Sequence, residues 1–130
     1  MKSSELVDYL RENGRVDDLK KRIAPALKEF SDGLQVKGGS APIILTIENK
    51  DIHVGSDEIK RLCMGYLDRT LNAIELEYVA SAFDICPDFT FEADSLKEMI
   101  SELSDLHTLE AAEIDEFVKT VVQSLEKKNA

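Results

Sequence analysis

The stretch Asn72-Ala73-Ile74-Glu75-Leu76-Glu77-Tyr78-Val79-Ala80-Ser81-Ala82-Phe83-Asp84-Ile85-Cys86-Pro87 decides the fold, because it is apolar on most sides. Asn72 and Glu75 have the spacing of a capping box at a helix start, and the closing proline ends the helix. Between them, only Glu77, Ser81 and Asp84 form a narrow polar strip. A helix that is hydrophobic nearly all round is buried, so we expect this one to be the most buried helix of the protein.

Helical patterns flank this stretch on both sides. Apolar residues recur at three- and four-residue steps over 16–34, and Ser56 caps a further helix with an apolar stripe. After the central stretch, Asp94 caps a helix with one apolar face, and a last helix begins near Thr108. Pro25 removes a backbone donor, so a kink or a break is expected just before it.

Short β-branched segments predict a small sheet. Ile43-Ile44-Leu45-Thr46-Ile47 has the composition of a buried strand, residues 48–51 form a turn, and Ile52-His53-Val54 returns beside it. Phe89-Thr90-Phe91 is the best candidate for a third strand, because an isolated hairpin is marginal in water. The expected fold class is α+β and mostly helical, with about five to six helices and a small antiparallel sheet built on the 43–54 hairpin. The alternative is an all-α bundle with a hairpin insertion.

Length and composition indicate a single domain over residues 1–130. With 43% hydrophobic residues, the chain is too apolar for a disordered tail and long enough to build one core. Gly38-Gly39-Ser40-Ala41-Pro42 predicts a flexible connection near 37–42. No apolar run approaches the roughly 20 residues of a membrane span, and acids stand where a signal peptide needs apolar residues. We therefore expect a cytoplasmic protein that does not enter the membrane.

Negative charge is concentrated in one part of the chain. Residues 1–67 hold 11 acids and 11 bases, whereas residues 68–116 hold 14 acids and only two bases, Arg69 and Lys97. Such a region repels phosphates, so direct nucleic-acid binding is not expected. A basic protein partner, a cation and simple solubility are the remaining explanations.

Six of these acids are the candidate partner-binding residues. Three of them stand four residues apart on a predicted helix and so share the face opposite its apolar one. A charge run is usually a solvated face that keeps a protein soluble. A surface shaped only for solubility more often mixes both signs, however, and the near absence of bases favours a docking surface. The six residues are Asp94, Glu98, Glu102, Asp105, Glu113 and Glu116.

Motifs for catalysis or for cofactor binding are not found, and we predict no enzyme activity, no metal and no cofactor. The acid-rich stretch 84–95 lacks the ligand positions of a calcium loop. Two histidines and two cysteines show neither the spacing of metal ligands nor that of a catalytic triad. Gly38-Gly39-Ser40 follows a helix and leads into a predicted strand, which is the reverse of a phosphate-binding loop.

The stretch Leu103-Ser104-Asp105-Leu106-His107-Thr108-Leu109-Glu110 resembles a helix start in the colicin-nuclease immunity proteins. The rest of the chain departs from their all-helical plan, and the resemblance assigns no residue a role. The sequence favours a non-enzymatic acidic module that binds and neutralises or regulates a basic protein, in one version a bacterial immunity protein against a nuclease toxin. The alternatives are an assembly subunit that homodimerises through Phe89, Phe91 or the hairpin, and a small enzyme of unknown reaction.

Overall fold

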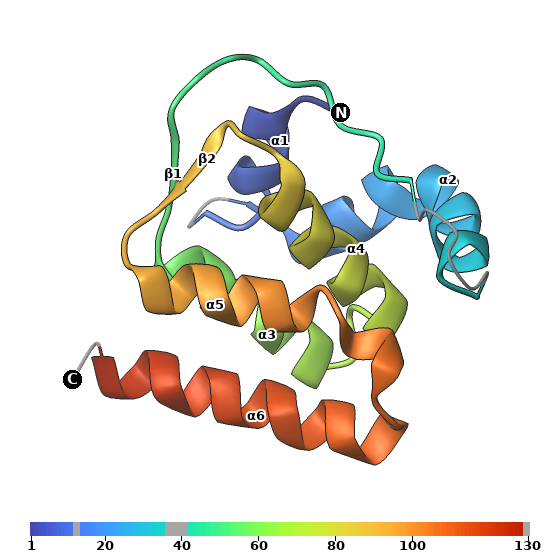
Figure 1. The fold of residues 1–130 in the computed structure, drawn as a ribbon, viewed down its shortest axis with the longest axis vertical. Helices are drawn as coiled ribbons and strands as arrows, with labels where there is room; N and C mark the ends of the chain where they lie inside the picture. The colour runs from blue at the N-terminus through green and yellow to red at the C-terminus, as the bar shows by residue number, and fades with distance from the viewer. Residues whose placement is uncertain (12–13, 36–41, 129–130) are drawn as a thin grey trace.

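The computed structural model describes residues 1–11, 14–35 and 42–128 (Figure 1). Within these residues the protein is mostly helical, with two short strands and one turn of 3-10 helix. The elements are α1 (Ser3–Asp8), α2 (Val16–Gln35), β1 (Ile52–Val54), α3 (Ser56–Leu67), α4 (Ala73–Ile85), β2 (Phe89–Phe91), α5 (Asp94–Leu103), η1 (Leu106–Thr108) and α6 (Ala111–Lys128). Most of the predicted connection near 37–42 lies outside the described residues.

Helix α4 is the centre of the core, as its apolar composition predicts. It contacts α2, α3, α5 and η1. Asn72 and Glu75 form the predicted capping box, in which Asn72 Oδ1 accepts the N–H of Glu75 at 2.9 Å. Tyr78 is 2% exposed and meets the ring of Phe30 from α2 edge to face, with ring centres 5.1 Å apart. Burial on most sides of α4 therefore joins the two halves of the chain in one apolar cluster.

The predicted antiparallel sheet on a 43–54 hairpin is wrong. Strand β1 pairs with β2, and the two strands run parallel, with Ile52 opposite Phe89. Among the described residues, the segment 43–47 contributes only an isolated bridge between Thr46 and Lys2. The hairpin does not form because β1 finds its partner beyond α3 and α4, and parallel strands require a long crossover connection of this kind.

Residues 42–51 instead cross the surface as an extended segment. Ile44 is 57% exposed and Ile47 is 50% exposed, so the apolar run 43–47 is not the buried strand that its composition predicts. Side-chain hydrogen bonds fix the end of this segment: Asp88 accepts the N–H of Glu48 at 2.7 Å and the hydroxyl of Ser3 at 2.6 Å. The segment is therefore held to α1 and to the start of β2 by polar contacts.

Helix α2 runs through Pro25 from Val16 to Gln35, so no break occurs there. The buried face of this helix carries Leu19, Ile23 and Phe30, whereas Pro25 itself is exposed. At the other end of the chain, α6 packs on α3 along the lower side of the molecule in Figure 1. None of the helices in the described part of the chain is both long and apolar enough to cross a membrane.

Candidate protein-interaction surface

Helix α5 separates its apolar and acidic residues onto opposite faces. Leu96, Ile100 and Leu103 are buried, at most 2% exposed, and fix the helix against α4. The exposed face carries three of the predicted acids at four-residue spacing. Because the apolar face of α5 is buried, the carboxylates on its opposite face point into water.

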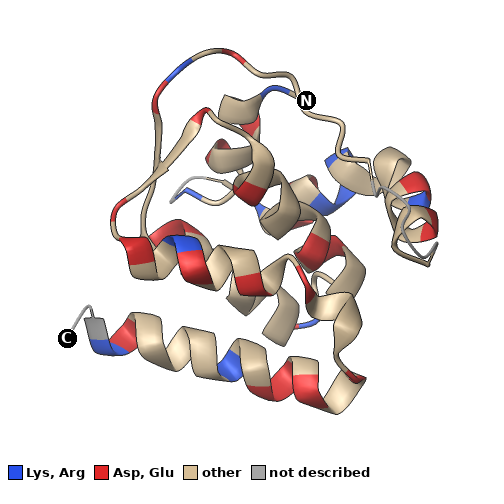
Figure 2. Cartoon of the chain, viewed as in Figure 1, with Lys and Arg blue, Asp and Glu red and all other residues tan. Residues whose placement is uncertain are grey.

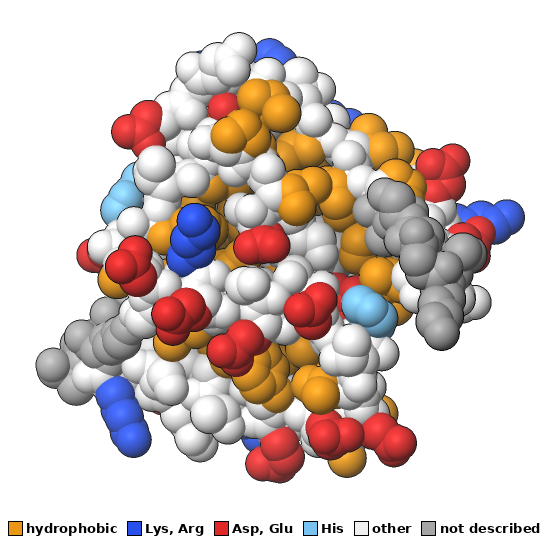
Figure 3. Space-filling model, in the orientation of Figure 1, with side chains coloured by type: hydrophobic (Ala, Val, Ile, Leu, Met, Phe, Trp, Pro, Cys, Tyr) orange, Lys and Arg blue, Asp and Glu red, His pale blue; other side chains and the backbone are white. Residues whose placement is uncertain are grey.

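The other three predicted acids follow just before η1 and in the first part of α6. All six are exposed: Asp94, Glu98, Glu102, Asp105, Glu113 and Glu116, which we call the acidic surface. Figure 2 shows Asp and Glu along α5 and again near the start of α6, and the space-filling view in Figure 3 shows acidic side chains over both helices on one face. The structure therefore brings the predicted residues together on one side of the protein.

Few cations neutralise the acidic surface. Among the side chains that the structure describes, Asp94, Glu98, Glu102 and Asp105 form no ion pair with a lysine or arginine. Glu116 has one, with Lys119 Nζ at 3.8 Å, and both of these side chains are more than half exposed. An exposed pair of this kind contributes little binding energy, so the surface keeps most of its negative charge available.

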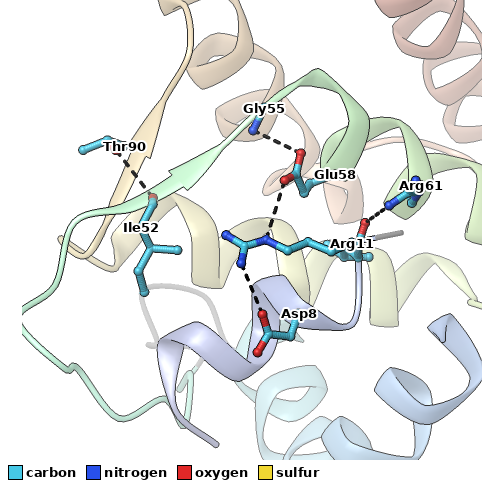
Figure 4. A network of polar contacts seen from close by, with 8 residues as sticks. Asp8, Arg11, Ile52, Gly55, Glu58, Arg61 and Thr90 are labelled. Atoms are coloured by element: carbon cyan, nitrogen blue, oxygen red, sulfur yellow. Dashed lines mark hydrogen bonds and ion pairs between the residues drawn. The ribbon is translucent and has the colours of Figure 1, made fainter. Parts of the chain in front are cut away.

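Several cations of the N-terminal half form ion pairs with acids outside the acidic surface. Figure 4 shows Arg11 between α1 and α3, with its guanidinium 3.4 Å from Asp8 and 3.9 Å from Glu58. In the same network Glu58 accepts the N–H of Gly55 at 3.3 Å, and Arg61 donates to the Leu10 carbonyl at 3.1 Å. Further pairs are Arg15–Asp17, Arg22–Glu5, Lys50–Glu48 and Lys60–Glu126. None of these pairs uses a carboxylate of the acidic surface.

Four acids of the 68–116 region hold the fold together instead of facing a partner. Each carboxylate accepts hydrogen bonds from another element, and three of the four are at most 3% exposed. The capping-box spacing could have identified Glu75, and a position inside the apolar α4 could have identified Glu77. Nothing local in the sequence indicates the other two. The pairs are Glu75 with Lys20, Glu77 with His107, Asp88 with Ser3, and Asp115 with Tyr66.

The two cysteines lie in the core and are not disulfide-bonded. Burial raises the pKa of the Cys63 thiol to about 12, so this side chain is a thiol and not a thiolate near neutral pH. Burial also raises the pKa of Cys86 above its ordinary value. In the part of the chain that is described, no three His, Cys, Asp or Glu side chains are grouped so that they could hold a metal ion.

A cleft beside the acidic surface was not predicted from the sequence. It lies between the end of α4, β2 and the start of α5, and has a volume of about 440 Å³. Figure 3 shows hydrophobic atoms among charged ones on this part of the face. Ile85 at its rim is 63% exposed, the most exposed large hydrophobic side chain among the residues described. The lining includes Ile85, Pro87, Phe89, Phe91, Asp94 and Lys97.

Comparison of the chain with protein-family models, with curated proteins and with solved structures finds no match.

Proposed function

We propose that this protein is a non-enzymatic interaction module that binds a basic protein through the acidic surface and so neutralises or regulates it. The observation that carries the proposal is the set of six exposed carboxylates on α5, on the turn that follows it and on α6, of which only Glu116 has an ion pair among the described side chains. An acidic patch of this kind accelerates association with a cationic partner and disfavours wrong partners. Occlusion of the partner's lysines and arginines is the proposed mechanism.

Charge reversal on α5 tests the proposal. The variant is Glu98→Lys with Glu102→Lys, and the matched control is Glu29→Lys with Asp32→Lys, two exposed acids of α2 with the same change in formal charge. The wild type and the control should retain partners from a lysate of the native cell, whereas the α5 variant should lose them. Added salt should weaken the retention by the wild type. Equal retention by both variants would show that the acidic surface is not the binding site.

One concrete version is a cytoplasmic immunity protein against a nuclease toxin, because nucleases bind phosphates through basic clefts. This version predicts that a neighbouring gene encodes the toxin. The wild type and the α2 control should each inhibit the purified nuclease, whereas the α5 variant should leave the nuclease active.

A homodimeric assembly subunit is the second candidate, and the exposed isoleucines support it. Ile44, Ile47 and Ile85 are each at least 50% exposed, and exposed apolar side chains often mark interfaces. Phe89, which the sequence suggested for this role, is only 7% exposed. Light scattering after size exclusion decides between the two candidates, because a monomer at all concentrations contradicts the assembly role.

A further inference from the structure

Strand β2 has an open edge. On its closed edge, the Asp88 carbonyl accepts the N–H of Ile52 at 2.8 Å, and the N–H of Glu92 donates to the Val54 carbonyl at 3.2 Å. Successive residues of a strand turn their backbone groups to opposite edges, so Phe89 and Phe91 face away from β1. Accordingly, neither the N–H nor the C=O of Phe91 is hydrogen-bonded to another backbone group of the described residues, although Phe91 stands opposite Val54 in the sheet.

The two phenylalanines of the open edge line the cleft. Phe89 and Phe91 line one side of the cleft, Ile85 and Pro87 of the α4 end line a second side, and Lys97 of α5 a third. Its volume of about 440 Å³ is within the roughly 300–1,000 Å³ of sites that bind ligands. An unpaired strand edge offers a template for a further strand, and peptides are commonly bound in this way.

Charge around the cleft is complementary to a cation. Asp84 and Asp94 line it together with Lys97, and both aspartates are exposed. A shallower hollow continues from it along α4 and α5 and adds Glu98, which belongs to the acidic surface. The path from the β2 edge to the acidic surface thus carries three carboxylates and one ammonium group.

We infer that an extended, basic segment of the protein partner binds in this cleft as a third strand beside β2. Its backbone would pair with Phe91, its apolar side chains would contact Ile85, and its lysines or arginines would meet Asp84, Asp94 and Glu98. The inference rests on the proposed function, because it assigns the basic partner a place and a backbone conformation. A second copy of this chain is a poorer occupant, since each copy carries a net charge of −10 and the cleft itself is acidic.

A peptide of alternating lysine and valine (Lys-Val-Lys-Val-Lys-Val, capped at both ends) is the probe. Amide hydrogen exchange of the intact protein is measured by NMR with and without it. At a peptide concentration that fills nine-tenths of the sites, exchange of the Phe91 amide should slow about tenfold, because only the free tenth exchanges. The His53 amide, which faces the outer edge of β1, should not change. The same peptide with N-methylated amides keeps the charge, but its methyl groups remove the backbone donors and hold its carbonyls away from the strand edge, so it should not protect Phe91.

A variant outside the acidic surface separates this inference from the proposed function. Asp84→Lys should weaken peptide binding more than the control Glu29→Lys, which changes the charge equally. Peptide-induced shifts confined to α5 and α6, without protection of Phe91, would overturn strand addition and leave the acidic surface as the binding site. Equal protection by the N-methylated peptide, or no perturbed amide at millimolar peptide, would also overturn it. Protection that rises with protein concentration alone would assign the cleft to a second copy.

Discussion

Glu77, inside the most apolar helix of the protein, contacts His107 through both carboxylate oxygens. Oε1 of Glu77 accepts the backbone N–H of His107, and Oε2 lies 2.7 Å from the Nδ1 atom of the same histidine. The carboxylate is 1% exposed. Its contacts with His107 hold η1, which lies in the connection between α5 and α6, against α4. The placement of Asp105 relative to the rest of the acidic surface therefore depends on a buried carboxylate and its contact with a partly exposed histidine.

Glu77→Gln should remove a pH dependence of stability. Burial is the largest influence on Glu77 and raises its pKa above the ordinary value of 4.5, while the contacts with His107 act in the opposite direction. A carboxyl group with a raised pKa favours the fold while it is protonated, and this contribution is lost as the pH rises from 4.5 through the raised pKa. The free energy of unfolding of the wild type should therefore fall relative to that of the variant as the pH rises above 4.5. Urea denaturation measures this difference; a constant difference would contradict it.

Lys20→Met should destabilise the protein by about 1–3 kcal/mol, because it leaves the carboxylate of Glu75 in the interior without its cation. Lys20 Nζ lies 2.8 Å and 3.0 Å from the two oxygens of Glu75, which is 3% exposed. Chemical denaturation compares the variant with Lys21→Met, an exposed neighbour for which we expect a change within about 0.5 kcal/mol. Equal stability of the two variants would show that water replaces the ammonium group.

Glu48→Gln should reduce stability near neutral pH but not in strong acid. Hydrogen bonds from Ser4, together with Lys50, lower the pKa of Glu48 from 4.5 to about 2. A lowered pKa stabilises the fold above pH 4.5, and this stabilisation is lost as the pH falls toward 2. The advantage of the wild type over the variant should thus shrink steadily over that range in urea titrations. An advantage that is independent of pH would mean that the carboxylate charge does not hold residues 42–51 in place.

Gly14→Ala should cost about 1–3 kcal/mol, the usual penalty for overpacking. A Cβ atom at Gly14 would lie 2.2 Å from the backbone carbonyl oxygen of Asp8, so main chain would have to move. Gly55→Ala is the matched control, because its nearest neighbours would be the flexible ends of Glu58 and Glu92, each at 3.3 Å, with His53 Nε2 at an ordinary 3.7 Å. Thermal unfolding should place the Gly14 variant clearly below the Gly55 variant, and the reverse order would contradict the packing at this turn.

The helical part of the fold was predictable because its signals are local. Asn72 and Glu75 of the capping box stand one helical turn apart, and the apolar residues on either side of Tyr78 belong to the same helix. Helix α4 therefore forms as expected. The sheet was not predictable in the same way. Ile52 pairs with Phe89 across two helices, and alternation along a strand does not reveal which strand lies beside it or in which direction.

The acidic surface shows a similar division. Helical spacing placed Glu98 and Glu102 on the face opposite Ile100, and both are exposed. The cleft has no motif, because it is built from the ends of three separate elements. Nor does the sequence indicate that Asp115 contacts Tyr66 at the α3–α6 packing while Glu113 stays exposed, since that partner stands 49 positions away in the chain.

The parallel pairing of β1 and β2 also has a kinetic consequence. Ile52 and Phe89 are 37 positions apart, so their hydrogen bonds become favourable only after α3 and α4 have collapsed together and closed that loop. The two strands should therefore be among the last parts of the chain to gain protection during refolding. Until the helices are assembled, the backbone groups of both strands stay unpaired, and this is the interval in which a folding molecule is most open to association with its neighbours.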